Sequence, residues 1–318
     1  MKNLLLFSKS ASYTSLLLCF LTAVFMLLAG AVQAQDEEKP EKDTRPVRNT
    51  FESNWLIDNQ TVMVPIKGTF EMDIQHRFGT VDNGYDDFWG IYAPSNIRIA
   101  FSYVPIEKLQ IGFGFTKERK IWDFNAKYAL FKQGRKGGSP LSLTYYVNVG
   151  IDTRAKASFP KDVYEGTDRY SYFHQLMVAR KFTKAFSLQA SVNVSHFNFQ
   201  ELVPGAENPE DLKQMNNDHL SLTFLGRLKV SSGMAIIAGY DLPLTDHDVN
   251  NPEPNFSFGI ETTSSAHAFQ IFLGNYNKIV PQLNNVFNQN KPQLGNIYKK
   301  DKNSNFLIGF NITRLWVF

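Results

Sequence analysis

Residues 141–152 read LSLTYYVNVGID, and apolar and polar side chains alternate along nearly the whole stretch. Leu141, Leu143 and Val147 occupy one set of positions, whereas Thr144 and Asn148 occupy the other. Successive side chains of a β-strand point to opposite faces of the strand. Alternation of this length therefore predicts a strand with one face in an apolar medium and the other in a polar medium.

The same period of two recurs from residue 69 to the end of the chain. It predicts about twelve strands, at residues 69–78, 97–103, 109–115, 122–130, 141–152, 170–180, 186–196, 220–230, 234–241, 255–261, 267–274 and 306–318. An even number of such strands is typical of a transmembrane β-barrel, which spans lipid with apolar residues outside and polar residues inside. We therefore expect an all-β fold with an antiparallel barrel over residues 68–318.

The lengths of the connections support a barrel in an outer membrane. Long connections, such as residues 79–96, 153–169 and 275–304, are interleaved with short ones, such as residues 105–108 and 183–185. Outer-membrane barrels carry long loops outside the cell and short turns in the periplasm. A soluble β-sandwich also alternates apolar with polar residues, but nothing requires its loops to alternate in length. We expect both termini in the periplasm of a Gram-negative bacterium.

Aromatic residues near the strand ends also fit contact with outer-membrane lipid. Trp122, Tyr128 and Tyr145 are placed to form the interfacial girdles of a barrel. The chain ends on an alternating strand with Trp316 and Phe318. This ending resembles the C-terminal signal that barrel-assembly machinery recognises, so that machinery is an expected partner.

The N-terminal part of the sequence reads as two segments that precede the barrel. Residues 1–34 have the basic start, apolar centre and small-residue end of a signal peptide, with cleavage expected before Gln35. The alternative is a membrane anchor, for which the apolar run of about 13 residues is short. Residues 35–67 are predicted to be a charged linker followed by a small hairpin with its turn at Asp58-Asn59. This segment is expected to plug the lumen or to reach a periplasmic partner.

Several short motifs, taken in order, resemble those of a protein family. They are TFES at 50–53, KGTFE at 67–71, HRFG at 76–79, DFNAKY at 123–128, HAFQ at 267–270 and GFNITR at 309–314. Together they resemble an uncharacterised family of outer-membrane β-barrel proteins from Bacteroidota. The resemblance implies a barrel fold and brings no activity with it.

Composition and motifs exclude several classes of function. The 33 basic and 30 acidic residues nearly balance, which argues against a nucleic-acid partner. Cys19, the only cysteine, lies in the predicted signal peptide, which excludes thiol chemistry in the mature chain. No histidine pair has the spacing of a helical metal site, and the Asp246-His247-Asp248 cluster is interpreted as a solvated loop. No nucleophile elbow or phosphate-binding loop is visible, so we assign no catalytic residue, metal or cofactor.

The charged residues on the polar strand faces are the candidate site. Charge on the lipid face would cost about 2–4 kcal/mol for Lys or Arg near the midplane, so these residues should point inward. The predicted lumen-lining residues are Glu71, Asp73, Arg77, Arg98, Asp123, Lys127, Arg227, Lys229 and Glu261. They can form salt bridges that fill a narrow barrel, or line a polar pore.

Three functions follow from this sequence. The first is a passive channel or transporter-like barrel for small solutes. The second is a structural or binding barrel that anchors a periplasmic partner through residues 35–67. The third is an outer-membrane hydrolase whose site is assembled from separate strands.

Overall fold

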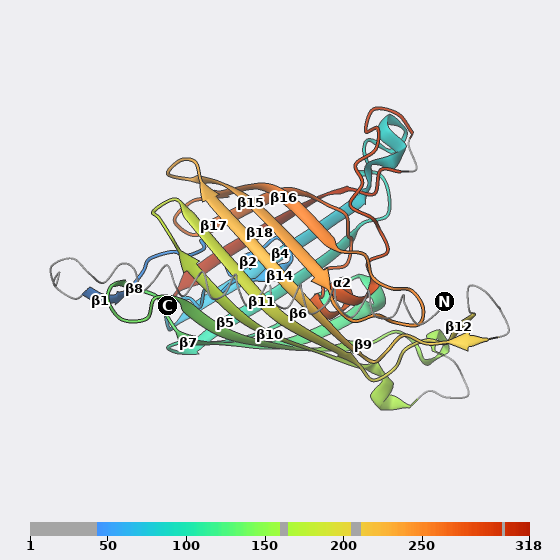
Figure 1. Ribbon diagram of the computed structural model, residues 1–318, viewed down its shortest axis with the longest axis horizontal. Coiled ribbons are helices and arrows are strands. Elements are labelled where there is room, and N and C mark those ends of the chain that lie inside the picture. The colour runs from blue at the N-terminus through green and yellow to red at the C-terminus, as the bar shows by residue number, and fades with distance from the viewer. Residues whose placement is uncertain (1–42, 160–164, 205–210, 301–302) are drawn as a thin grey trace, which may run out of the picture.

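The computed structural model describes residues 43–159, 165–204, 211–300 and 303–318. Twelve antiparallel strands form a closed barrel, in which the last strand pairs with the first (Figure 1). The predicted strands are all present, with ends within three residues of those expected. The strands are β4 (Thr69–Thr80), β5 (Asn96–Ile106), β6 (Leu109–Thr116), β7 (Ile121–Phe131), β9 (Ser142–Asp152), β10 (Tyr170–Lys181), β11 (Phe186–Phe197), β14 (Asp218–Lys229), β15 (Met234–Pro243), β16 (Asn255–Thr263), β17 (His267–Gly274) and β18 (Leu307–Val317).

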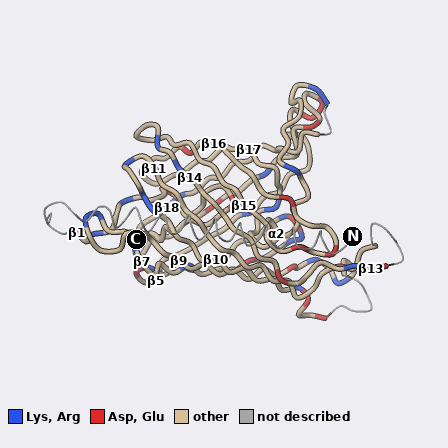
Figure 2. Tube along the Cα trace, in the orientation of Figure 1, with Lys and Arg blue, Asp and Glu red and all other residues tan. Residues whose placement is uncertain are grey.

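The wall of the barrel separates apolar from polar side chains as the alternation predicts. On β6, Ile111, Phe113 and Phe115 are exposed on the outer surface, whereas Gln110 faces inward and is buried. The same alternation of exposed and buried residues runs along the other strands. Figure 2 shows charged residues at the two ends of the barrel and in the loops, and those on the strands include residues buried inside the barrel. The outer wall is therefore an apolar band suited to lipid.

The two ends of the barrel differ in their connections. One end, which we name the short-turn end, carries the turns that follow β5, β10, β14 and β16. The other end, the loop end, carries the long connections that follow β4, β9, β11, β15 and β17. The helices η1 (Val81–Asp87), η2 (Glu118–Lys120), η3 (Lys156–Ser158), η4 (Gly166–Arg169) and α2 (Pro281–Phe287) lie in loop-end connections, as does the pair β12 (Val203–Pro204) and β13 (Leu212–Lys213). None of the described helices is long and apolar enough to span a membrane.

Part of the segment expected to be a linker is an ordered strand. At the short-turn end, β1 (Asp43–Pro46) pairs with β8 (Gly134–Lys136), which lies in the connection after β7. Asp43 accepts two hydrogen bonds from the Arg45 side chain and lies 3.6 Å from Arg135. These contacts give the charged sequence a partner that composition alone did not indicate. The predicted signal peptide and residues 35–42 lie outside the described residues.

The predicted hairpin is present, with its turn one residue earlier than expected. Strands β2 (Trp55–Leu56) and β3 (Asn59–Gln60) pair around Ile57-Asp58, and Ile57 has a φ of 58°. The hairpin lies within the barrel (Figure 1). This placement brings it against the polar faces of the strands.

Candidate functional site

Residues 50–64 run through the lumen of the barrel. All of them except Glu52 and Met63 are buried. Their apolar members pack with inward-facing residues of the strands, so that Phe51, Leu56 and Ile57 share one cluster with Tyr146 and Phe173. The lumen therefore has a mixed core, to which this segment supplies the centre.

The tip of the hairpin is fixed by three strands. Asp58 forms a fully buried ion pair with Arg77 of β4. The Ile57 amide donates to Gln270 Oε1 at 2.9 Å, and its carbonyl accepts from Asn311 Nδ2 at 2.6 Å. The wall thereby supplies a counter-charge for Asp58 and hydrogen-bond partners for both backbone polar groups of Ile57.

The sides of the hairpin bind other strands. Lys127 of β7 donates to Gln60 Oε1 at 2.7 Å and to Asn54 Oδ1 at 3.2 Å. Asn54 in turn donates to Glu71 of β4, and Asn59 donates to Asp241 Oδ1 of β15 at 3.0 Å. Amide side chains of the segment thus lie between charges of opposite sign on the wall.

The backbone beyond the hairpin is held in the same way. The Val62 amide donates to Gln189 Oε1 of β11 at 2.9 Å, and its carbonyl accepts from Thr144 Oγ1 of β9 at 3.0 Å. Gln189 also donates to the Gln60 carbonyl at 2.7 Å. Contacts from β9 and β11, the two strands that flank β10 in the barrel, therefore hold this short stretch of chain.

Two further ion pairs close within the wall itself. Arg98 of β5 reaches over β6 to Asp123 of β7, with nitrogen–oxygen distances of 2.7 and 2.8 Å. Gly114 of β6 leaves the space for this, because a Cβ there would lie 2.6 Å from the guanidinium of Arg98. Arg227 and Glu261 form the second pair at 2.7 Å. Arg227 also lies 3.7 Å from Glu52 of the segment, but each pair balances its charges within the wall.

The structure places the predicted residues as follows. Lys229 is half-buried near the short-turn end and joins no ion pair or side-chain hydrogen bond among the described residues. Trp316 packs on the outer wall with its ring 5.7 Å from that of Phe70, and Phe318 is exposed. Their role as an assembly signal stays a prediction. Buried in the lumen are Glu71, Asp73, Arg77, Arg98, Asp123, Lys127, Arg227 and Glu261.

Sequence reasoning missed the residues that complete this network. Asn54, Asp58 and Asn59 interrupt the apolar runs of the segment, and we interpreted Asp58 and Asn59 only as turn residues. Polar residues that flank buried apolar ones need partners. That need was a usable signal, although it does not say which strands supply the partners.

A second element enters the lumen from the loop end. Gln282 of α2 donates to Asn148 Oδ1 at 3.0 Å and to Ser171 Oγ at 3.2 Å, and Asn285 accepts from Ser221 Oγ at 2.8 Å. Tyr276, which precedes α2, is fully buried and hydrogen-bonds Asp58 of the hairpin. The segment and this loop therefore meet inside the barrel.

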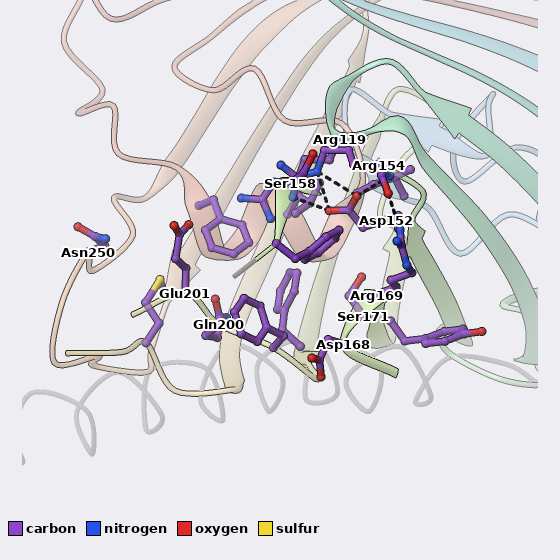
Figure 3. A pocket seen from close by; sticks show the side chains of 18 of the residues that line it. Arg119, Asp152, Arg154, Ser158, Asp168, Arg169, Ser171, Gln200, Glu201 and Asn250 are labelled. Atoms are coloured by element: carbon purple, nitrogen blue, oxygen red, sulfur yellow. Dashed lines mark hydrogen bonds and ion pairs between the residues drawn. The ribbon is translucent and has the colours of Figure 1, made fainter. Parts of the chain in front are cut away.

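A cavity of about 370 Å³ lies at the loop end, beside α2. Figure 3 shows Arg119, Arg154 and Asp152 together on one side of it, with Gln200 and Glu201 across from them. The floor is apolar. Sequence analysis assigned nothing here, because the loops that form the cavity follow no period.

The histidine-containing loop was interpreted wrongly as solvated at His247. This side chain is buried, with Nε2 3.0 Å from His219 Nδ1, and its Nδ1 accepts from the Asn216 amide at 3.0 Å. Burial lowers the pKa of His247 below its ordinary value. No group of three or more potential metal ligands occurs in the described ranges.

One carboxylate–histidine contact occurs at the rim of the barrel. His196 Nδ1 lies 2.7 Å from Asp218 Oδ1, with both side chains exposed on the outer side. Within the part of the chain that the structure describes, no serine hydroxyl hydrogen-bonds either residue. The pair therefore lacks the nucleophile that a hydrolytic triad requires.

The comparisons with known proteins agree with this architecture. The family described as "Membrane bound beta barrel domain (DUF5777)", a domain of unknown function, matches residues 51–316. The chain belongs to this family. Its barrel has the even strand number and apolar outer band of bacterial outer-membrane proteins, and the protein is an outer-membrane β-barrel. No curated protein sequence matches the chain.

Solved structures of similar fold include a porin and an outer membrane channel. The NanC porin is 7% identical, with 78% of this chain and 99% of that chain covered and a TM-score of 0.45. An outer membrane channel from Pseudomonas putida is 12% identical, with coverage of 80% and 97% and a TM-score of 0.45. OmpT of Vibrio cholerae is 12% identical, with coverage of 79% and 78% and a TM-score of 0.34. At these identities the likeness concerns the fold alone.

Proposed function

We propose that the protein is an outer-membrane channel for small polar solutes, closed in this structure by residues 50–64, which act as a plug. The observation that carries the proposal is the hydrogen bonding of this segment to strands all around the wall. The cavity left between the hairpin and β4 to β7 has a volume of only about 10 Å³, which is the space of one water molecule.

The chemistry of the contacts favours a plug over a permanent core. Most polar contacts of the segment are to side chains of the wall, and its only regular backbone pairing is within its own hairpin. Water can replace such contacts when the segment leaves. The wall ion pairs Arg98–Asp123 and Arg227–Glu261 would remain, so the opened lumen would keep a polar, charge-balanced surface.

The loop that contains α2 is a second closure in series with the first. It follows β17 and crosses the loop end, where Gln282 attaches it to β9 and β10 and Asn285 attaches it to β14. Full opening therefore requires that both elements move, and removal of the plug alone should give a narrow path.

Liposome swelling in sugar or amino-acid solutions tests the proposal. A plug variant replaces residues 50–64 with an equal number of Gly and Ser residues, and a loop variant does the same for residues 278–290. We expect slow swelling with the intact chain, faster swelling with the plug variant and the fastest with both changes. Replacement of residues 43–46, which lie outside the lumen, is the matched control and should leave the rate unchanged.

Two results would contradict the channel. One is an absence of swelling with the doubly changed protein when its heat-modifiable migration in gels shows a folded barrel. The other is swelling of the intact chain at the rate of the double variant, since the segment would then close nothing.

A second candidate is a barrel that anchors a periplasmic partner. A cavity of about 590 Å³ at the short-turn end is lined by residues of the N-terminal segment and by the turns of the barrel. Ile66 is exposed at this end. Capture of one partner by the intact chain, lost on replacement of residues 43–49, would favour this candidate.

A further inference from the structure

The cavity at the loop end contains an arginine that the fold presents at an unusual position. Arg119 and Lys120 form the tight turn between β6 and β7, with φ values of 52° and 48°. This left-handed region is sparsely populated by residues other than glycine, and such backbone clusters at functional sites. The turn directs the Arg119 side chain into the cavity.

Arg119 differs from the other two arginines of the cavity in its partners. Its guanidinium lies over the ring of Phe287, 4.6 Å from the ring centroid, and donates no hydrogen bond to any described residue. Arg154 is held by the Asp152 carboxylate at 2.7 Å, and Arg169 donates to two backbone carbonyls. Burial and the neighbouring Arg154 lower the pKa of Arg119. The guanidinium remains a cation at neutral pH, with its donors directed to the cavity.

No acidic residue that lines the cavity forms an ion pair with Arg119. Asp152 is engaged by Arg154, and Asp168 accepts a hydrogen bond from the Glu165 amide at 2.6 Å. Glu201 is exposed on the opposite side and forms no ion pair with Arg119. Glu118, Asp152 and Glu201 favour the charged form of Arg119 from a distance, but no described carboxylate forms an ion pair or hydrogen bond with this guanidinium beside Phe287.

Beside Arg119, one side of the cavity is apolar, whereas Gln200, Glu201 and Asn250 line other parts of it. Phe197 and Phe287 pack edge to face with their ring centroids 5.1 Å apart, and Met215 and Leu283 extend this surface. The cavity volume of about 370 Å³ lies in the range of small-molecule sites, which combine an apolar lining with a few directed polar groups.

We propose that this cavity binds a small amphipathic oxyanion, meaning a carboxylate, phosphate or sulfonate group on an aromatic or apolar body. Arg119 binds the anion, and the phenylalanine rings contact the body. This site is separate from the plug and does not depend on whether the barrel conducts. Because Leu283 and Phe287 belong to α2, a bound ligand contacts the loop that closes this end.

Fluorine NMR of the full chain in nanodiscs tests the site with two probes, para-trifluoromethylbenzoate and its neutral amide. We expect saturable binding of the benzoate and at least about tenfold weaker binding of the amide, because only the anion forms charge-assisted hydrogen bonds. Arg119→Gln should weaken the binding of the benzoate by a similar factor and leave the affinity for the amide unchanged. Phe287→Ala should weaken the binding of both probes.

Controls separate the site from general effects. Arg135→Gln, at the short-turn end, should bind both probes as the unaltered chain does. Arg119→Lys, which keeps the charge but not the planar fork, should bind the benzoate with intermediate affinity. Displacement of the benzoate by an anionic lipid added to the nanodiscs would identify a lipid headgroup as the source of the oxyanion. Displacement by a free aryl phosphate alone would identify a solute.

The proposal is overturned by any of three results. They are equal affinity for benzoate and amide, unchanged benzoate affinity in folded Arg119→Gln, and no binding of the benzoate at millimolar concentration. Displacement of the benzoate by inorganic phosphate at equal concentration would overturn the role of the apolar surface.

Discussion

At the scale of single residues, the lumen shows how small side chains make room for charges. Arg98 can bridge from β5 to Asp123 on β7 only because Gly114 on the intervening strand has no side chain. The sequence pattern predicted an inward face for each of these positions. It could not show that the glycine and the ion pair depend on each other, because they lie on three different strands.

Gly114→Ala tests this dependence. The added methyl group would meet the Arg98 guanidinium, which Asp123 and Gln75 hold in place. We expect a loss of about 1–3 kcal/mol in the free energy of unfolding, as for other overpacked sites. Urea titration of the folded band in gels measures it. Gly226→Ala, where a Cβ would meet only Leu188 at 3.6 Å, is the control and should change little.

The Asp58–Arg77 pair should hold the tip of the plug. Asp58→Asn leaves Arg77 buried without a carboxylate, which costs about 3–5 kcal/mol in comparable pairs. Cys19, the only cysteine of the sequence, lies in the predicted signal peptide, so in the mature chain Thr61→Cys, at a fully buried position, can report release of the segment by its reaction with a maleimide. We expect Asp58→Asn to raise the labelling rate by about 100-fold.

The double variant Asp58→Asn with Arg77→Gln gives the matched comparison. Both charges are removed together, so most of the lost protection of Thr61→Cys from maleimide labelling should return. Equal labelling of the single variant and the unaltered chain would contradict the role of this ion pair.

At the scale of elements, the strands and the hairpin were predictable, whereas the contacts that hold the hairpin inside the barrel were not. Contact with lipid on one face imposes the period of two, which is legible in the sequence of each strand. Residues 50–64 touch the wall through side chains at irregular positions, so no period marks them. The two apolar runs of this segment are equally compatible with burial in the lumen and with binding to a partner protein.

The turn at Arg119 was predictable from the sequence only in part. The short connection between β6 and β7 was predicted, and tight hairpin turns favour Asn or Gly at positions of positive φ. Arg119 and Lys120 depart from that preference, and this departure was a usable signal for a site. The aromatic side of the cavity comes from distant loops and had no such signal.

The loop after β15 should loosen in acid because of His247. Its folded pKa is lowered from the ordinary value of 6.5 by burial, so the loop is fully stabilised above that value. The stabilisation is lost progressively as the pH falls from 6.5 through the lowered pKa, because protonation charges a ring that is buried against His219. The flanking Asp246 and Asp248 oppose this shift without reversing it.

Hydrogen exchange of residues 244–251 at several pH values measures the effect. After correction for the intrinsic exchange rate, which itself falls with pH, we expect lower protection factors below pH 6.5 than above it in the unaltered chain, and no such loss of protection in His247→Asn. A response to pH that persists in His247→Asn would assign the effect to another group.

At the scale of the whole molecule, the barrel is a polar lumen closed by two elements that meet inside it. The hairpin and the α2 loop share the Asp58–Tyr276 contact, so movement of one changes the surroundings of the other. The apolar outer band and the ion pairs Arg98–Asp123 and Arg227–Glu261 do not require either element, and Arg77, which loses Asp58 when the segment is replaced, is then exposed to water in the opened lumen. The barrel should therefore stay folded when both are replaced.

Single-channel recording in planar bilayers tests the closure most directly. We expect no steady current from the intact chain and a stable conductance from the protein in which residues 50–64 and 278–290 are both replaced. Silence of that folded double variant over many insertions, or the same conductance from the intact chain, would contradict the account.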